Sequence, residues 1–370
     1  MRVSFRTDAS LQIGTGHVLR CLTLADALAA EGADCEFLCR EHDGHLIEFI
    51  RRKGYVTHPL PIPTEASSPA LCADIDRPAA ELAHGNWLGA TQAQDAEVCS
   101  PILAIQQPDW LIVDHYALDA EWEHAVAPHC RKLMVIDDLA DRPHACDLLL
   151  DQTLGREAID YQPRVPTACH LLCGSQYALL RPEFAALRRR SLKRRAQPVF
   201  RELLITMGGI DKANVTGQVL RALRLCPLPA DCRIAAVMGA KAPWLDDVRE
   251  NAQDLPWPTR VLVGISNMAE LMADSDIAIG SAGTTSWELC CLGVPMILFM
   301  LADNQRKIAR ALERAGAASL PRRDRGATPF LKELLVPLSN DPSRLHRMSE
   351  SAANVVDGTG VKSVMLHMGA

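Results

Sequence analysis

The amino-acid sequence predicts an α/β protein of two Rossmann-like domains, each built on a doubly wound parallel sheet (the GT-B arrangement), with a cleft between them. Short apolar segments alternate with helical patterns along most of the chain, which favours parallel sheets covered by helices. The alternation stops near residue 155 and restarts near residue 199, and 370 residues exceed one ordinary core. Polar or small residues directly follow several apolar segments, at the sheet edge where such proteins bind ligands.

The first half of the chain contains six apolar segments that we interpret as strands. The predicted strands are Arg2–Thr7, Asp34–Arg40, Tyr55–Pro61, Trp110–Asp114, Lys132–Asp137 and Asp147–Asp151. Helical periodicity lies between them, in Val18–Ala30, His45–Lys53 and Glu97–Gln107. Residues 62–94 are rich in Ala, Pro and Ser and lack a clear period, so we expect a surface excursion there. The triplet Asp74-Ile75-Asp76 lies in this excursion and follows no strand, so we do not interpret it as a metal site.

The second half repeats the alternation after a stretch with several prolines. The predicted strands are Glu202–Met207, Arg233–Met238, Arg260–Val263, Asp276–Gly280 and Pro295–Met300. The predicted helices are Asn214–Leu225, Met268–Ala273, Thr284–Leu292 and Asn304–Ala315. We therefore place an N-terminal domain at residues 1–160, an interdomain crossing at 161–198 and a C-terminal domain at 199–370. The basic run Arg188–Arg195 fits a solvated linker or helix face better than a binding arm.

Composition narrows the class of partners. The net charge of −6 argues against a cationic nucleic-acid surface and against polybasic attachment to a membrane. The start of the chain lacks the pattern of a signal peptide, and no apolar stretch approaches the ~20 residues of a membrane span. The 13 cysteines are an odd number without a CxxC pair, which is typical of reduced thiols. We expect a cytoplasmic monomer that neither enters membranes nor binds nucleic acid.

The loop after the first strand carries the most informative histidine. Gly14 and Gly16 allow a close backbone approach or a positive φ. His17 would begin the following helix, where the positive end of the dipole disfavours the imidazolium and favours a neutral ring that can take a proton from water. A packed or hydrogen-bonded histidine at a helix start fits the position equally well. Asp8 would orient the ring or the water, although a carboxylate that stabilises a turn fits the pattern better.

Further polar residues follow the fourth and fifth predicted strands, at the same edge as the His17 loop. They are Asp114-His115-Tyr116 and Asp137-Asp138. Two consecutive carboxylates suggest a metal, but strand-end capping and turn formation account for Asp137 and Asp138 more simply. The sequence therefore predicts neither a metal site nor a cofactor.

Small residues follow two predicted strands of the second half. Met207-Gly208-Gly209 ends one strand, and Ser281-Ala282-Gly283-Thr284 ends another and opens a helix. Free N–H groups at such a place suit a diphosphate. Glu288, further along that helix, can accept hydrogen bonds from ribose hydroxyls, and Gln305 would lie near the same edge. Each position also fits helix capping, but together they predict a nucleotide-diphosphate pocket within one domain.

Two sets of motifs resemble known families. The small-residue loop, Glu288, Gly293-Val294-Pro295 and Asp303-Asn304-Gln305 resemble the donor half of GT-B glycosyltransferases, most closely the lipid-II-forming N-acetylglucosaminyltransferases. More specific motifs resemble the UDP-sugar hydrolases of pseudaminic acid biosynthesis. These motifs are Phe5-Arg6-Thr7-Asp8-Ala9-Ser10, Ile13-Gly14-Thr15-Gly16-His17-Val18 with Arg20 and Cys21, Asp114-His115-Tyr116, Gly174 with the run Tyr177–Phe184, and Met207-Gly208-Gly209.

The hydrolase resemblance implies a reaction and a set of site residues. Water would displace UDP from a UDP-linked 2,4-diacetamido-2,4,6-trideoxy sugar with inversion and without a metal, and His17 would be the base, assisted by Asp8. The sugar would face Arg6, Gly14, Gly16, His115 and Tyr116. UDP would lie against Gly208, Gly209, Ile265, Ser281, Ala282, Gly283, Thr284, Glu288 and Gln305. Residues 62–94 and the C-terminal extension do not match the family. A GT-B glycosyltransferase with a UDP-sugar donor and a non-catalytic nucleotide-sugar binder remain as alternatives.

Overall fold

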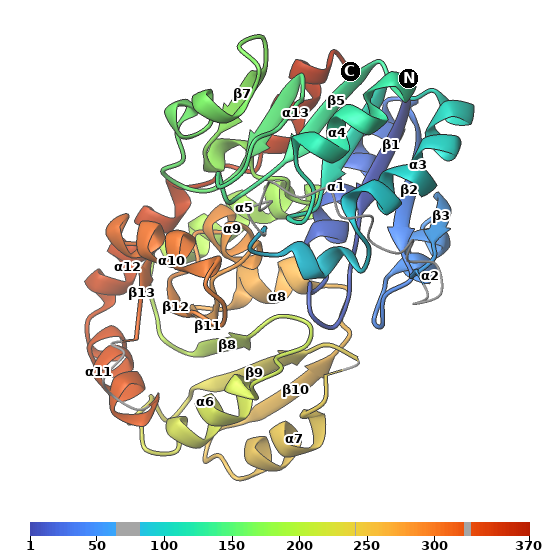
Figure 1. Ribbon diagram of the computed structural model, residues 1–370. Coiled ribbons are helices and arrows are strands. Elements are labelled where there is room, and N and C mark those ends of the chain that lie inside the picture. The colour runs from blue at the N-terminus through green and yellow to red at the C-terminus, as the bar shows by residue number, and fades with distance from the viewer. Residues whose placement is uncertain (64–81, 241, 322–326) are drawn as a thin grey trace. The chain divides into compact units, whose positions relative to one another are not determined.

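The computed structural model describes residues 1–63, 82–240, 242–321 and 327–370 (Figure 1). The triplet Asp74-Ile75-Asp76 lies outside the described residues. The chain divides into two compact units: unit 1 comprises Met1–Leu179 with Val361–Ala370, and unit 2 comprises Leu180–Gly360. The division therefore passes through the segment that the sequence suggests as a crossing, and the last ten residues return to unit 1.

Unit 1 is built on a sheet of seven described strands in the order β3-β2-β1-β4-β5-β6-β7. All of its strand pairs are parallel. The strands are β1 Arg2–Thr7, β2 Asp34–Arg40, β3 Val56–Leu60, β4 Trp110–Asp114, β5 Lys132–Ile136, β6 Leu148–Asp151 and β7 His170–Cys173. The α-helices are α1 Gly16–Ala30, α2 Ile47–Arg52, α3 Gln92–Gln106, α4 Ala120–Val126 and α13 Gly360–Met368.

The elements of unit 1 follow the predicted pattern, except that the prediction did not include α4 or β7 and placed α13 in the other domain. The prediction missed β7, because its four residues lie in a proline-rich stretch at the sheet edge. It also assigned α13 to the C-terminal domain. The red helix α13 lies beside the strands of unit 1 in Figure 1, where Val364 and Met368 join the apolar core. Trp110 Nε1 donates a hydrogen bond of 3.2 Å to the Met368 carbonyl, so burial of apolar side chains and this bond hold the C-terminus on unit 1.

Unit 2 is built on a second parallel sheet, whose six described strands have the order β10-β9-β8-β11-β12-β13. The strands are β8 Glu202–Thr206, β9 Arg233–Met238, β10 Thr259–Val263, β11 Ile277–Ser281, β12 Met296–Phe299 and β13 Ala318–Ser319. The helices are α5 Pro182–Arg195, α6 Val215–Leu223, α7 Leu245–Gln253, α8 Met268–Asp274, α9 Thr285–Cys291, α10 Gln305–Arg314, α11 Ala327–Asn340 and α12 Pro342–Ala353.

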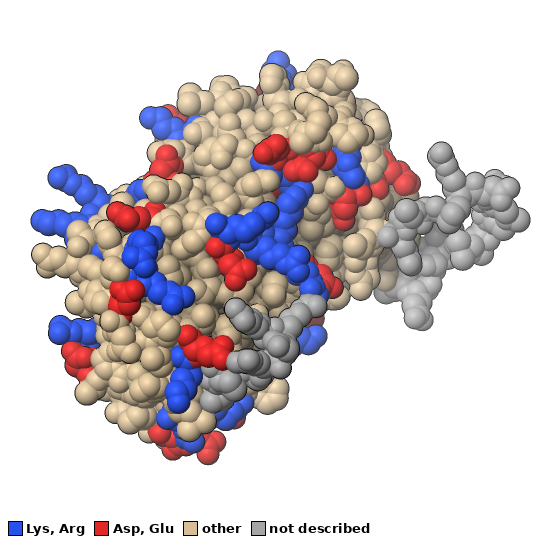
Figure 2. All heavy atoms as spheres, turned by 90° about the vertical axis from the view of Figure 1, so that its left-hand side faces the viewer, with Lys and Arg blue, Asp and Glu red and all other residues tan. Residues whose placement is uncertain are grey.

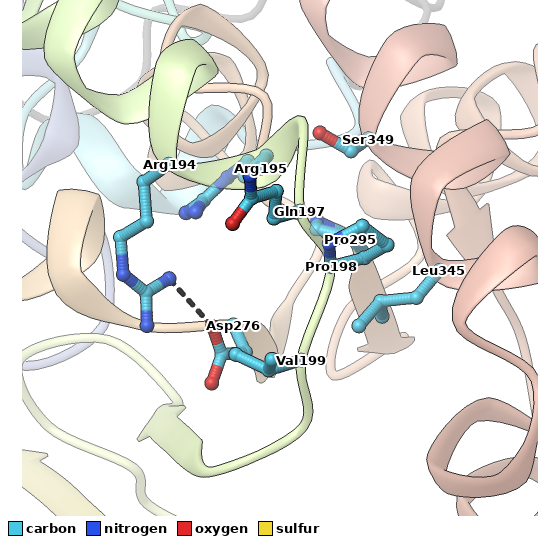
Figure 3. Close-up of a pocket in the computed structure, with 9 residues that line it drawn as sticks. All are labelled: Arg194, Arg195, Gln197, Pro198, Val199, Asp276, Pro295, Leu345 and Ser349. Atoms are coloured by element: carbon cyan, nitrogen blue, oxygen red, sulfur yellow. Dashed lines mark ion pairs between the residues drawn. The ribbon is translucent and has the colours of Figure 1, made fainter.

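The basic run of residues 188–195 belongs to α5, and the prediction of a solvated linker or face is wrong for two of its arginines. Arg188 donates to three carbonyl oxygens at or just beyond the C-terminal ends of α9 and α12. Arg195 is buried and donates to three carbonyls at or near the ends of α8 and α9. Burial lowers the pKa of Arg195 to about 10. Beside it, Arg194 pairs with Asp276 at 2.5 Å (Figure 3). Arg188 and Arg195 thus supply donors to carbonyl groups at helix ends, where intrahelical donors run out.

Each sheet has one place where the order of strands along the chain reverses. In unit 1 this switch point lies between β1 and β4, where Thr7 pairs with Asp114. In unit 2 it lies between β8 and β11, where Thr206 pairs with Gly280. Loops at the carboxyl ends of the two flanking strands diverge there and leave room for a ligand.

The surface carries mixed charge. On the face drawn in Figure 2, basic side chains are interspersed with acidic ones. A hollow of about 570 Å³ on α10 of unit 2 is lined by Arg306, Lys307, Arg310, Glu313 and Arg314. No helix among the residues described is long and apolar enough to cross a membrane. Every cysteine in the described ranges is a free thiol, as predicted.

Candidate functional site

A histidine–aspartate pair occupies the switch point of unit 1. His17, the second residue of α1, places Nδ1 2.6 Å from Oδ1 of Asp114, the last residue of β4. Arg20 donates to both oxygens of the same carboxylate, from Nε at 2.6 Å and from Nη2 at 2.7 Å. Burial alone would raise the pKa of Asp114, but the charges of Arg20 and His17 outweigh burial and hold that pKa well below its usual range.

The ionised Asp114 decides which ring nitrogen of His17 carries the proton. A carboxylate only accepts hydrogen bonds, so Nδ1 of His17 must be the donor, and Nε2 of the neutral ring keeps its lone pair. The His17 side chain is 10% exposed, so the ring is firmly packed and still reaches the surface. The pair has the arrangement of a base and its orienting carboxylate, which can accept a proton from water.

Tyr116 and Asp138 complete a closed network around this pair. The Tyr116 ring meets the His17 ring edge-on, with centroids 4.6 Å apart. Its hydroxyl donates to Oδ2 of Asp138 at 2.7 Å, and Arg20 Nη1 donates to the same oxygen at 2.6 Å. The Tyr116 side chain therefore holds the His17 ring in place. Tyr116 is only 6% exposed, so little of it is available for the predicted contact with a sugar.

Sequence reasoning missed the parts that Arg20 and Asp138 play and the contact of Asp114 with His17. Arg20 lies three residues after His17 on α1, and residues at this spacing share a helix face, so that signal was present. Asp138 was interpreted with Asp137 as a strand-end cap. This holds for Asp137, whose Oδ2 accepts the N–H groups two and three residues later.

Asp114, and not Asp8, is hydrogen-bonded to the His17 ring, so the prediction that Asp8 orients the ring is wrong. The Asp8 side chain is fully buried, and its Oδ1 accepts from Arg6 Nη1 and from the backbone N–H of Arg40, both at 2.7 Å. His115 Nε2 lies 3.3 Å from Oδ2. Although burial would raise the pKa of Asp8, Arg6 and His115 hold it well below its usual range. Asp8 is thus a structural carboxylate that links β1 to β2.

Arg6 and His115 are too buried for the sugar contacts predicted for them. Arg6 is 0% exposed, and its Nε and Nη2 donate to the Asp95 carboxylate on α3 at 3.1 and 2.7 Å. His115 is 3% exposed, and its Nδ1 accepts the N–H of Ala117 at 3.1 Å. Arg6 faces inward because its charge neutralises the buried carboxylates of Asp8 and Asp95, which are costly to leave unpaired. Burial lowers the pKa of His115, so its ring faces Asp8 as a neutral imidazole.

The two glycines before His17 have different roles. Gly14 adopts φ +82° and donates its N–H to the Ser10 carbonyl at 2.9 Å, so it closes a tight turn after β1. Gly16 is the first residue of α1. A Cβ added at Gly14 would contact nothing within 4 Å, so the backbone conformation and not a lack of space favours glycine there.

In unit 2 the predicted small-residue loops flank the switch point. Gly208 and Gly209 follow β8 with exposed backbone, and Gly208 has φ +90°. Ala282 to Thr284 lead from β11 into α9. A Cβ added at Gly283 would meet nothing within 4 Å, so the space above this residue is open. The structure therefore brings these two loops together, as the sequence predicts for neighbouring parallel strands.

The other predicted nucleotide contacts lie on separate elements: Glu288 on α9, Gln305 at the start of α10 and Ile265 after β10. The Glu288 side chain on α9 is 21% exposed, and Arg181 Nη2 lies 3.6 Å from its Oε1. Burial raises the pKa of Glu288 to about 7. Gln305 accepts the Leu301 N–H at 2.8 Å and so closes its own loop. Ile265 follows β10, the edge strand, two strands from β8. Within the described ranges, no three His, Cys, Asp or Glu side chains are arranged to hold a metal ion.

Solved structures identify the fold. The chain superimposes on MurG of Acinetobacter baumannii with a TM-score of 0.68 and 15% identity, over 100% of this chain and 99% of that one. It superimposes on the UDP-GlcNAc 2-epimerase of Neisseria meningitidis bound to UDP-GlcNAc with a TM-score of 0.62 and 12% identity, over 100% and 99% of the chains. The two parallel-sheet units are therefore those of a GT-B fold, which confirms the predicted fold class.

Sequence comparison specifies the resemblance further. Residues 203–363 match the glycosyltransferase family 28 C-terminal domain. The chain is 27% identical to the UDP-2,4-diacetamido-2,4,6-trideoxy-beta-L-altropyranose hydrolase of Campylobacter jejuni, over 85% of this chain and 97% of that protein. It is 35% identical over 158 residues to a UDP-N-acetylglucosamine–N-acetylmuramyl-(pentapeptide) pyrophosphoryl-undecaprenol N-acetylglucosamine transferase of Salinibacter ruber, 41% of each chain. The resemblance predicted from the motifs is confirmed.

Proposed function

We propose that the chain is an enzyme that hydrolyses a UDP-linked 2,4-diacetamido-2,4,6-trideoxy sugar to UDP and the free sugar with inversion. The similarity to the Campylobacter jejuni hydrolase over most of both chains supports the substrate class. The observation that carries the chemistry is the His17–Asp114 hydrogen bond of 2.6 Å, which leaves Nε2 of His17 as the acceptor.

In the proposed step, His17 Nε2 takes a proton from a water molecule while the water oxygen bonds to the anomeric carbon. The bond from that carbon to the UDP oxygen breaks, and UDP leaves with the bonding electrons. Asp114 stabilises the imidazolium that forms, and Arg20 holds Asp114 in place. One base on the face opposite the leaving group is sufficient for inversion. No metal or cofactor has a part in the proposal.

The loops at the switch point of unit 2 are proposed to bind UDP. Gly208, Gly209 and the segment 281–284 present backbone without bulky side chains. N–H groups at a helix start have no intrahelical acceptor and can meet the charge of a diphosphate, which makes UDP a better leaving group. The match of residues 203–363 to the family 28 C-terminal domain supports this assignment. Glu288 is proposed as the acceptor for ribose hydroxyls, with Ile265 and Gln305 at the margin.

The proposed base can be tested with His17→Asn. The asparagine amide takes the place of Nδ1, so it can still donate to Asp114, but it offers no group in place of Nε2. We expect hydrolysis of the UDP-sugar without any acceptor to fall by about 10²–10⁴, the usual contribution of a general base. The Kd for UDP, measured by calorimetry, should stay within about twofold. His124→Asn, on the exposed histidine of α4, is the matched control and should retain full turnover.

Two outcomes would contradict the proposal. Retained turnover in the His17→Asn variant would exclude His17 as the base. Release of UDP only after an acceptor is added would favour a GT-B glycosyltransferase, the alternative that the fold and the Salinibacter ruber relative support. Tight binding of the UDP-sugar by the wild type without turnover would indicate a binding protein instead.

A further inference from the structure

An aromatic cluster next to His17 has no part in the function proposed so far. His84 and Trp87 pack against each other with ring centroids 4.3 Å apart. Both rings also contact Tyr116, at 5.5 and 5.8 Å, and the Trp87 and Tyr116 planes are inclined by only 25°. Trp87 lies 6.5 Å from the His17 ring. The rings therefore form one continuous surface that ends at the proposed base.

The cluster is firmly anchored in unit 1. Trp87 belongs to a short 3₁₀ helix, η2 Gly85–Leu88. The next residue, Leu88, is 1% exposed in the apolar core, and a Cβ at Gly89 would lie 2.7 Å from the His42 ring. A few residues later, Thr91 caps the start of α3. These contacts hold the residues that follow Trp87 against the core of unit 1.

The rings are also accessible. His84 and Trp87 are both half-buried, whereas Leu88 beside them is buried. Burial lowers the pKa of His84, so its ring is neutral at pH 7 and can pack against an apolar group without the cost of burying a charge. An exposed aromatic surface of this kind is costly in water unless a ligand or partner covers it.

The origin of the cluster suggests that it determines specificity. Residues 84 and 87 lie in the 62–94 stretch, which carries none of the motifs that the chain shares with the hydrolases. A ring supplied from outside the shared motifs can adapt the site to one sugar without altering the base.

We propose that His84 and Trp87 form the sugar subsite of this enzyme and bind the apolar side of a deoxy-sugar that carries acetamido groups. The negative face of an aromatic ring attracts C–H groups, and a pyranose presents several on one side. A sugar with a methyl group in place of a 6-hydroxyl, and with acetamido methyls, adds apolar surface that Trp87 can cover. This inference rests on the proposed function, because it places the substrate's sugar next to His17.

The test compares binding of the whole substrate with binding of the nucleotide alone. The Kd values for UDP-2,4-diacetamido-2,4,6-trideoxy-β-L-altropyranose and for UDP are measured in the His17→Asn background, with Trp87 intact, Trp87→Ala or Trp87→Phe. We expect Trp87→Ala to weaken the UDP-sugar by roughly tenfold, with UDP changed by less than about twofold. Trp87→Phe should recover most of the affinity, because it keeps a flat ring. His84→Ala should show a smaller loss of the same kind.

A second measurement covers the case in which Trp87→Ala fails to fold. In an otherwise intact Trp87→Phe protein, whose folding is checked by thermal melting, the fluorescence change caused by the UDP-sugar beyond that caused by UDP should disappear. Equal affinities for the UDP-sugar in all Trp87 variants would overturn the subsite, as would an equal loss for UDP. Turnover retained in His17→Asn would contradict the proposed base, and the same comparison would then use the KM for the UDP-sugar and the inhibition constant for UDP in the Trp87 variants, so the two failures are distinguishable.

Discussion

The carboxyl edges of the two sheets are chemically opposite. At the switch point of unit 1, four polar side chains form one hydrogen-bonded network: His17, Arg20, Asp114 and Asp138. At the switch point of unit 2, small residues follow both strands, namely Gly208 and Gly209 after β8 and Ser281 to Thr284 around the end of β11, and Glu288 lies further along α9. Unit 2 keeps its buried arginine, Arg195, on α5, bonded to helix-end carbonyls.

This difference matches two kinds of chemistry. A base must keep one tautomer and one orientation, and a network of ion pairs provides both, at the cost of desolvating every member. An anion site needs donors without a competing negative charge, and backbone N–H groups provide those once small side chains let the ligand approach. Each unit therefore accounts for one half of the proposed reaction, and variants of one edge should leave the function of the other edge intact.

The largest effect is expected from Asp114→Asn. The asparagine amide can donate to Nδ1 of His17, which would move the ring proton to Nε2 and remove the acceptor. We expect the kcat for UDP-sugar hydrolysis to fall by about 10³–10⁴, as for the equivalent change in a serine-protease triad. The Kd for UDP should change by less than about twofold. Steady-state kinetics and calorimetry on the same preparation check both values.

The control for this variant lies at the opposite end of the same strand. Asp109 directly precedes β4 and accepts the backbone N–H of Arg2 at 2.9 Å. Asp109→Asn removes a carboxylate of similar type without touching the network, and it should retain turnover. If Asp114→Asn instead lost UDP binding and turnover together, the two edges would not act separately and the comparison would fail.

The strands were the most predictable part of the fold. The predicted bounds of β1, β2, β4 and β9 are those observed, because short apolar runs flanked by turn residues leave little choice of register. The strand β7 and the short strand β13 were missed, because they lie at sheet edges and need few apolar residues. Such short segments become strands because they pair with strands that are distant in the sequence, and the local pattern of residues does not show this pairing.

The partners of the site residues were less predictable than their positions. His17, Asp114 and the small-residue loops were placed at the correct edges, because parallel strands bring their carboxyl ends together. Asp8 was chosen to orient His17 because it is near in sequence, whereas Asp114, 97 residues away, makes the contact. The pairing of Arg6 with Asp95 spans 89 residues and was not predicted at all. Such contacts depend on side-chain direction across strands and helices, which a periodic pattern does not specify.

A moderate effect is expected in unit 2 from Gly283→Asp, which places a carboxylate beside the proposed diphosphate. The open space above Gly283 accommodates the side chain, so the change should act through charge. Repulsion between like charges should weaken UDP by about 10- to 100-fold, and the loss should shrink as salt is added. Gly283→Asn has nearly the same shape without the charge. An equal loss in both variants would mean that Gly283 lies against UDP for steric reasons or that the diphosphate binds elsewhere.

The smallest effect is expected from the titration of Glu288. Its pKa of about 7 in the folded chain exceeds the ordinary value of 4.5, so folding favours the protonated form. Stability that depends on this proton is fully present below pH 4.5 and is lost as the pH rises through 7. Glu288→Gln should therefore raise the Tm at pH 8 and leave it unchanged at pH 4.

The titration of Glu288 should also change the affinity for UDP. A carboxylate accepts two ribose hydroxyls better than a carboxylic acid does, so we expect the affinity for UDP to fall severalfold from pH 8 to pH 6. The terminal phosphate of UDP also titrates near pH 6 and affects the affinity in both proteins equally. Glu288→Gln therefore serves as the control, because the difference between the two pH profiles of affinity comes from Glu288 alone. Identical pH profiles for the wild type and Glu288→Gln would show that this carboxylate does not contact the ribose. The proposed nucleotide site of unit 2 would then lack a carboxylate for the ribose.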